Sequence, residues 1–186
     1  GPYPQIWPTL EWNTASLESQ GMCPDEVQSV IDYAFLEGND TGAIIVIRNG
    51  YIVIEEYDSG KTENDLATSW SVGKSFASAL MGVALEEGLV SSLDETTGQY
   101  FPEWSGTERE NISIRNLMTL RTGLEADCLG PPNDFDNGGN SIYFSLDQVA
   151  CALNRELQGP IGEKLYSYSN SDVMLAGEIM EITSGM

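Results

Sequence analysis

The sequence predicts an α+β fold in which a small antiparallel sheet comes first and a mainly helical part follows. Two runs of β-prone residues, 41–48 and 51–57, flank Asn49-Gly50. Asn-Gly between such runs is the strongest short-range signal for a hairpin, because both turn positions need a positive φ. After residue 70 the apolar residues recur at helical spacing instead. Only the two hairpin strands are visible, so we expect the sheet to be incomplete in this stretch.

Three regions follow along the chain. Residues 1–20 hold prolines and tryptophans without periodicity, so we expect an extended N-terminal arm. Residues 21–60 are expected to form one helix, opened by Pro24 and closed by Gly38, and then the hairpin. Residues 61–186 are expected to be a mainly helical subdomain. Its predicted helices lie near 72–87, 94–100, 114–120, 145–153 and 171–183.

Residues 125–144 form the longest stretch without periodicity. They are rich in Gly, Asn, Asp and Pro, and a loop of about 20 residues inside a compact domain is usually functional or mobile. We expect this loop to cover a functional site. Ser113 is the predicted N-cap of the helix before it, and Ser145 to Gln148 is a predicted capping box after it. Cys128 and Cys151 flank this region and either pair, in an oxidising compartment, or stay buried thiols.

The composition excludes several classes of function. There are 29 acidic and 8 basic residues, a net charge of -21, so nucleic acid and anionic membranes are poor partners. The absence of histidine removes every Ser-His-Asp and Cys-His triad and all His-based metal motifs, and no C-x-x-C occurs. We therefore expect no metal and no other cofactor. No apolar run approaches the ~20 residues of a membrane span, and no signal-peptide pattern is present; a periplasmic or secreted location, with a leader already removed, is favoured over a cytoplasmic one.

The first candidate for chemistry is the pair Ser71 and Lys74. Ser71 is expected at the start of the 72–87 helix, with Lys74 projecting from the same face one turn later. An amine within hydrogen-bond reach supplies the base that an unactivated serine needs, and the helix N-terminus favours negative charge on the oxygen. Taken alone, the short pattern is more often a capping serine with a solvated lysine.

The second candidate is Tyr168 with Asn170. Residues i and i+2 of an extended segment face alike, so both side chains can point to one site. In the functional interpretation Tyr168 is a phenolate-type base helped by Lys74, while Asn170 holds the substrate amide or orients Lys74. In the alternative interpretation the tyrosine ring packs in a loop and the asparagine caps the next helix.

The order of these segments resembles the class C β-lactamase-like and penicillin-binding-protein-like serine hydrolases. The resemblance runs from about residue 20 to the end of the chain, which is more specific than either short motif. It implies the β-lactamase/transpeptidase-like form of the α+β fold, in its N-terminal part. The segments that carry it are Thr68–Phe76 around the serine, Leu89–Pro102, Ile112–Leu124 and Tyr166–Leu175.

The resemblance also implies roles for the candidate residues. Ser71 is expected to be acylated, Lys74 and Tyr168 to move the proton, and Asn170 to help bind a small ester, amide or lactam. Trp70, expected to contact the substrate, and the turn at 120–123 look closer to the esterase and 6-aminohexanoate-dimer-hydrolase branch than to true β-lactamases. A resemblance to this branch does not distinguish carboxylester substrates from linear amide substrates.

One part of the family pattern is not found in the sequence. The third motif, a Lys-Thr-Gly or His-x-Gly strand that supplies the second oxyanion-hole amide, would lie beyond Met186. Losing one such donor commonly costs about 10²–10³ in rate. We therefore expect a C-terminal half or a second chain to complete the sheet and the site.

The same sequence suggests three other interpretations. Gly73-Lys74-Ser75 suggests a phosphate loop, but that motif needs a glycine where Thr68 stands. The nucleophile elbow fails because Ser69 replaces its first glycine and the chain has no histidine for the triad. The serious alternative is a non-catalytic or incomplete relative that binds ligand or needs a C-terminal partner chain.

Overall fold

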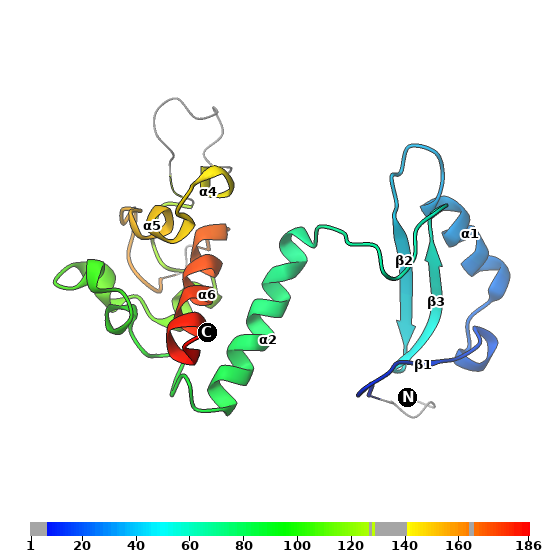
Figure 1. Ribbon diagram of the computed structural model, residues 1–186, viewed down its shortest axis with the longest axis horizontal. Helices are drawn as coiled ribbons and strands as arrows, with labels where there is room; N and C mark the ends of the chain where they lie inside the picture. The colour runs from blue at the N-terminus through cyan, green and yellow to red at the C-terminus, as the bar shows by residue number, and fades with distance from the viewer. Residues whose placement is uncertain (1–6, 127, 129–140, 164–165) are drawn as a thin grey trace. The chain divides into compact units, whose positions relative to one another are not determined.

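The computed structural model describes residues 7–126, 128, 141–163 and 166–186, so most of the loop predicted at 125–144 lies outside the described residues (Figure 1). The chain divides into two compact units, Gly1–Thr68 and Ser69–Met186. Among the described residues, none of the helices has both the length and the apolar character needed to cross a membrane.

The first unit contains the predicted hairpin. Strands β2 (Ala43–Arg48) and β3 (Tyr51–Tyr57) pair antiparallel, with a register shift between Val46 and Ile47. The turn has φ values of 51° at Asn49 and 86° at Gly50, the positive values that an Asn-Gly hairpin turn requires. Helix α1 (Pro24–Ala34) precedes the hairpin, with a proline in its first turn as predicted (Figure 1).

The sheet has a third strand that the sequence analysis did not find. Strand β1 (Asn13–Thr14) pairs parallel to β3, which gives the order β1-β3-β2, and a 3-10 turn, η1 (Glu18–Gln20), follows it. The expectation that the sheet has hairpin strands alone was wrong here, because a short part of the segment predicted as an extended arm supplies a third strand. A two-residue strand is too short to show alternation, and its pairing depends on a partner far along the chain.

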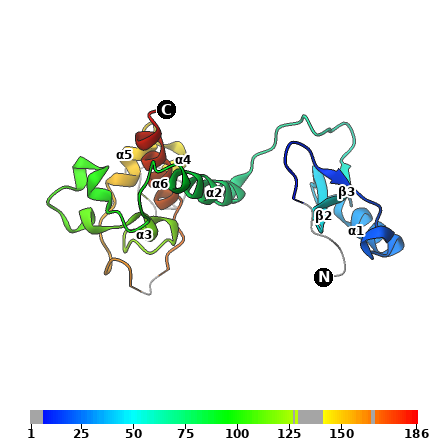
Figure 2. The same cartoon turned by 90° about the horizontal axis from the view of Figure 1, so that it is seen from below.

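The second unit is helical. Its two long helices are α2 (Gly73–Glu86), which directly follows the 3-10 turn η2 (Trp70–Val72), and α6 (Asn170–Ser184). Figures 1 and 2 show α2 and α6 side by side, with their N-terminal ends at the same end of the unit. The remaining elements are η3 (Thr97–Gln99), η4 (Pro102–Trp104), η5 (Glu108–Asn111), α3 (Ile114–Met118), α4 (Ser141–Phe144) and α5 (Gln148–Leu153).

The core of this unit is built around α6. Leu175, Ala176 and Ile179 are fully buried, and Trp104 packs into the same core while its indole Nε1 donates to the Leu153 carbonyl at 2.9 Å. The hydrogen bond satisfies the polar end of a side chain that is otherwise apolar. Burial of this kind fixes α6 from several sides. The other large buried side chains are Met81, Val90, Phe101, Ile112, Ile114, Leu117 and Ile142.

Two helix starts test the predicted caps. The cap at Ser113 is confirmed: its hydroxyl accepts from the Asn116 amide at 3.1 Å, and the Asn116 side chain accepts from the Ser113 amide at 2.9 Å. The capping box at Ser145 was wrong. Asp147 caps α5 instead, accepting from the Ala150 amide at 2.8 Å, and its carboxylate is at least as good a cap as a serine hydroxyl.

The region between the caps differs from its prediction as well. Residues 141–144, expected to be loop, form the short helix α4. Cys128 and Cys151 form a disulfide with their Cα atoms 5.5 Å apart, whereas Cys23 is an exposed free thiol. The disulfide closes the segment that contains α4 and most of α5.

Candidate active site

The chain enters the site through a strained turn. Trp70 has a φ of 46°, a left-handed conformation that is unfavourable for a bulky side chain and tends to occur where function maintains it. Ser71 follows within η2, directly before the first turn of α2, and its side chain is exposed. The turn places the serine hydroxyl at the N-terminal end of a helix, where negative charge is favoured.

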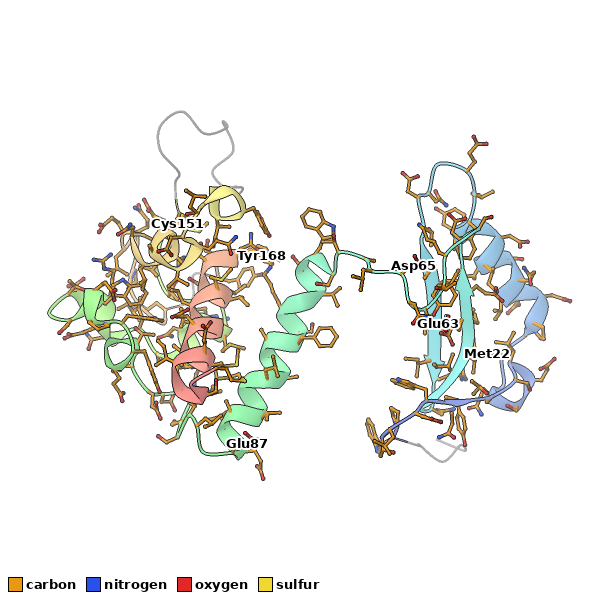
Figure 3. The ribbon with its side chains drawn as sticks, viewed as in Figure 1. Met22, Glu63, Asp65, Glu87, Cys151 and Tyr168 are labelled. Atoms are coloured by element: carbon orange, nitrogen blue, oxygen red, sulfur yellow. A yellow bond between two sulfur atoms is a disulfide. The ribbon has the colours of Figure 1, made fainter. Side chains whose placement is uncertain are left out.

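The second contribution comes from the start of α6. Ser169 is the N-cap of this helix, and its hydroxyl accepts from the Asp172 amide at 3.0 Å. The extended Ser169 separates Tyr168 from Asn170, the first residue of the helix. Tyr168 remains 46% exposed, whereas Ser169 is buried. Figure 3 labels Tyr168 at the N-terminal end of α6.

Four predicted residues meet at this point. The oxygen atoms of Ser71 and Tyr168 lie 2.5 Å apart, and Lys74 Nζ lies 3.2 Å from Ser71 Oγ. Lys74 Nζ also donates to Asn170 Oδ1 at 2.6 Å and lies 4.9 Å from the centre of the Tyr168 ring. The serine hydroxyl is therefore within direct reach of a phenol and an amine.

The arrangement has a defined chemical capacity. Either oxygen of the Ser71–Tyr168 pair can be the donor, so a proton can pass directly between them. Lys74 donates to both Ser71 and Asn170, so a positive charge on its amine stabilises negative charge that develops on the serine oxygen. Together these groups can activate a serine without a histidine.

A pocket of about 500 Å³ begins beside these residues. Trp70, Lys74 and Asn170 line it together with residues of α4, α5 and the rest of α6. Trp70 contacts Tyr143 of α4 edge to face, with ring centres 6.5 Å apart. The fifth predicted site residue, Trp70, thus lies at the pocket and not among the hydrogen-bonded groups.

A buried ion pair supports the start of α6. Arg155 Nη2 lies 2.8 Å from Asp172 Oδ1, with both side chains almost completely buried. Arg155 Nη1 also donates to Ser169 Oγ at 3.1 Å, and the Thr122 hydroxyl donates to Asp172 Oδ2 at 3.1 Å. Burial raises the pKa of the Asp172 carboxyl, while Arg155, Thr122 and Ser169 oppose that rise. The N-cap beside Tyr168 and Asn170 is therefore part of a buried polar network.

Several functional candidates were missed by sequence reasoning. Tyr143, Gln148 and Val149 line the pocket, but they belong to a region that the sequence analysis treated as loop and ordinary helix. Asp172 carried only a weak signal, because it is the acidic residue three positions after a capping serine. Arg155 carried no such signal. Within the described ranges, no group of three or more acidic or cysteine side chains is placed to hold a metal ion.

Comparisons with known proteins agree on one family. The family profile described as Beta-lactamase matches residues 34–186. A 6-aminohexanoate-dimer hydrolase from Paenarthrobacter ureafaciens is 23% identical over 75% of this chain and 38% of its own length. A β-lactamase from Pseudomonas fluorescens is 34% identical over 74% of this chain and 37% of its own length.

Solved structures show the same fold. A Bacillus anthracis protein, provisionally named a 6-aminohexanoate-dimer hydrolase, superposes with a TM-score of 0.71 at 19% identity, over 98% of this chain and 50% of that protein. A class C β-lactamase in complex with cefoxitin gives 0.61 at 24% identity, over 90% and 46%. The predicted β-lactamase/transpeptidase-like fold is confirmed, and the chain spans half or less of the length of these relatives.

Proposed function

The chain belongs to the β-lactamase family, and we propose from its site that it is a serine hydrolase that cleaves an ester or amide through an acyl-enzyme on Ser71. The observation that carries the proposal is the 2.5 Å contact between Ser71 Oγ and Tyr168 Oη, with Lys74 Nζ 3.2 Å from the same serine oxygen. The names of the relatives, a dimer hydrolase and a β-lactamase, support a hydrolase.

Acylation follows from this geometry. Tyr168 as a phenolate takes the proton of Ser71 while Ser71 Oγ attacks the carbonyl carbon, and Lys74 stabilises the negative charge on the two oxygens. When the tetrahedral intermediate collapses, the bond to the leaving oxygen or nitrogen breaks. Tyr168 then returns the proton to the leaving group, so the acyl-enzyme forms with the phenolate restored.

Deacylation uses the same groups in reverse. Tyr168 takes a proton from a water molecule, and the hydroxide attacks the acyl carbon. The bond to Ser71 Oγ breaks, and Tyr168 returns the proton to the serine oxygen, which restores the free enzyme. Asn170 accepts a hydrogen bond from Lys74 at 2.6 Å and so keeps the amine beside Ser71 throughout.

Covalent labelling tests the proposal. The chain is incubated with a fluorophosphonate probe, and its intact mass is measured. We expect one adduct, lost in Ser71→Ala and in Tyr168→Phe. Ser78→Ala, which removes an exposed hydroxyl from α2, and Tyr166→Phe, which alters an exposed tyrosine two residues from Tyr168, should both label normally.

The alternative results separate the proposals. An adduct that forms only after a C-terminal half is added would mean that the site is divided between two polypeptides, and no adduct under either condition would favour the non-catalytic interpretation and leave Ser71 as a residue that only starts a helix. An adduct that persists in Ser71→Ala would place the reactive group elsewhere. Labelling that survives Tyr168→Phe but not Ser71→Ala would keep the nucleophile and remove the role proposed for the phenol.

The exposed face of α2 suggests that further polypeptide completes this enzyme. Phe76, Leu80 and Val83 are 50–66% exposed and recur at helical spacing. Relatives about twice as long as this chain contain a further segment. We propose that polypeptide equivalent to that segment covers this stripe, so the chain alone should bind the dye ANS and Leu80→Ser should reduce that binding. Equal dye binding by both chains would contradict the proposal.

A further inference from the structure

We propose that Tyr143 determines substrate specificity, because with Trp70 it forms an aromatic wall that binds an uncharged aromatic group on the acyl side of the substrate. The inference rests on the function proposed for Ser71. It assigns a role to α4, a short helix in a region where the sequence analysis expected only a loop.

The wall consists of two exposed aromatic rings beside the nucleophile. Trp70 is 75% and Tyr143 is 50% exposed, and their rings meet at an interplanar angle of 73°. Exposed rings in an edge-to-face pair offer free faces and edges on which a third ring can stack. Ile142, the neighbour of Tyr143, is 1% exposed and lines the same pocket, so it anchors this part of α4 in the core.

The position of the pocket distinguishes the two sides of the substrate. In the proposed reaction Tyr168 protonates the leaving group, so the leaving group must lie on the Tyr168 side of the serine oxygen. Trp70, Lys74 and Asn170 are among the residues that line the pocket, whereas Ser71 and Tyr168 are not. Because Lys74, whose Nζ lies 3.2 Å from Ser71 Oγ, lines the pocket and Tyr168 does not, the proposal places the acyl group in the pocket, against the aromatic wall.

The negative charge of the pocket further limits which acyl groups can bind there. Glu178 and Glu181, from the part of α6 farther from the site, line it as well. Burial and the neighbouring Glu181 raise the pKa of Glu178, and Asp147 contributes in the same direction. Carboxylates here disfavour an anionic acyl group, so the wall is suited to a neutral aromatic ring.

The disulfide positions the wall. Tyr143 lies within the segment that Cys128 and Cys151 close. Cys151, labelled in Figure 3, belongs to α5, which also supplies Gln148 and Val149 to the pocket. A cross-link at both ends of a segment restricts the conformations it can adopt. Cys128 and Cys151 thus act as positioning residues for Tyr143, without touching the substrate.

Equilibrium binding tests the inference without any turnover. The Ser71→Ala chain is titrated, with NMR detection, against N-methylphenylacetamide and N-methylacetamide, which differ only in the phenyl ring. We expect the phenyl compound to bind about tenfold more tightly or better. Adding Tyr143→Ala should remove most of this preference and adding Tyr143→Phe should keep it. Tyr33→Ala, at an exposed tyrosine of α1, should also keep it.

The disulfide has a matched control in the free thiol. Cys151→Ser in the same background should lower the preference for the phenyl compound several-fold, whereas Cys23→Ser should not change it. Equal affinity for the two amides, including no detectable binding of either, overturns the inference, as does a preference that survives Tyr143→Ala. Failure of the proposed hydrolase function would appear separately, as absence of the fluorophosphonate adduct on the chain with Ser71 intact.

Discussion

The two helices that supply the site are held in different ways. Figures 1 and 2 show their N-terminal ends at the same end of the unit, and the hydrogen bond between Ser71 and Tyr168 joins the residues just before them. However, α6 has five buried residues and α2 only Met81 and Ala84. The first turn of α6 is also attached to Arg155 through Asp172 and Ser169. Within the second unit, one side of the site is therefore fixed by the core, whereas the other has few buried side chains.

Because of this difference, substitutions in the two helices should affect the stability of the fold to different extents. Substitutions of Ser169, Asp172 or Arg155 should act through folding, because these three side chains form one buried polar network at the start of α6. Substitutions on the outer face of α2 should leave folding nearly unchanged, because few of its contacts are lost.

The largest effect is expected at the buried ion pair. Arg155→Met leaves the Asp172 carboxylate buried and unpaired, which should lower the free energy of unfolding by about 3–5 kcal/mol. Arg115→Met is the matched control, because Arg115 contacts Asp94 at 2.7 Å with 52% and 69% of the two side chains exposed. It should produce no measurable change in urea unfolding. Equal destabilisation by the two variants would contradict the distinction between the helices.

A pair of leucines compares the helices directly. Leu175→Ala in α6 removes a fully buried side chain and should lower the free energy of unfolding by about 2–5 kcal/mol. Leu80→Ala in α2 alters a side chain that is 58% exposed, and should change it by less than about 0.5 kcal/mol. Urea titration of both variants measures the difference. A cost at Leu80 that matches the cost at Leu175 would mean that α2 is packed as tightly as α6.

Much of the site could be predicted from the sequence. Ser71 and Lys74 are separated by one helical turn, and Tyr168 and Asn170 by two residues, so each pair is a local feature that short-range geometry determines. The resemblance to a known family, which runs in the same order along the chain, then predicted that the two pairs belong to one site. The hairpin was equally local, because Asn49-Gly50 specifies its own turn.

The remaining features depend on contacts distant in the chain. Arg155 resembles an ordinary surface arginine after a helix, and its burial follows only from its packing against Asp172. Tyr143 lies in a segment without periodicity, so its approach to Trp70 could not be read from local pattern. Strand β1 likewise exists only because β3 pairs with it.

The smallest effect is expected at a second carboxylate, which contrasts with Asp172. Glu95 lies in the segment after α2 and accepts hydrogen bonds from the Ser91 amide at 2.7 Å, the Ser91 hydroxyl and the Tyr100 hydroxyl. Bonds from Ser91 and Tyr100 hold the pKa of Glu95 below its usual value of 4.5, whereas burial raises the pKa of Asp172. The ionised Glu95 therefore stabilises the fold above about pH 4.5, and this contribution is lost as the pH falls through the lowered pKa.

Thermal unfolding measured between pH 6 and pH 3 should show the loss of this contribution as a small decrease in Tm. We expect a decrease below about 4 °C, because Glu95 is close to solvent and its ionisation contributes little. A change of about 1 kcal/mol shifts the Tm of a domain of this size by about 2–4 °C. Glu95→Gln cannot ionise, so its own share of the acid sensitivity should disappear, while Glu103→Gln, at an exposed carboxylate of η4, should retain the full decrease. An unchanged acid response in Glu95→Gln would mean that these hydrogen bonds stabilise the protonated and ionised forms equally. In that case, the segment after α2 would be stabilised by apolar packing alone, which is also what stabilises most of the length of α6.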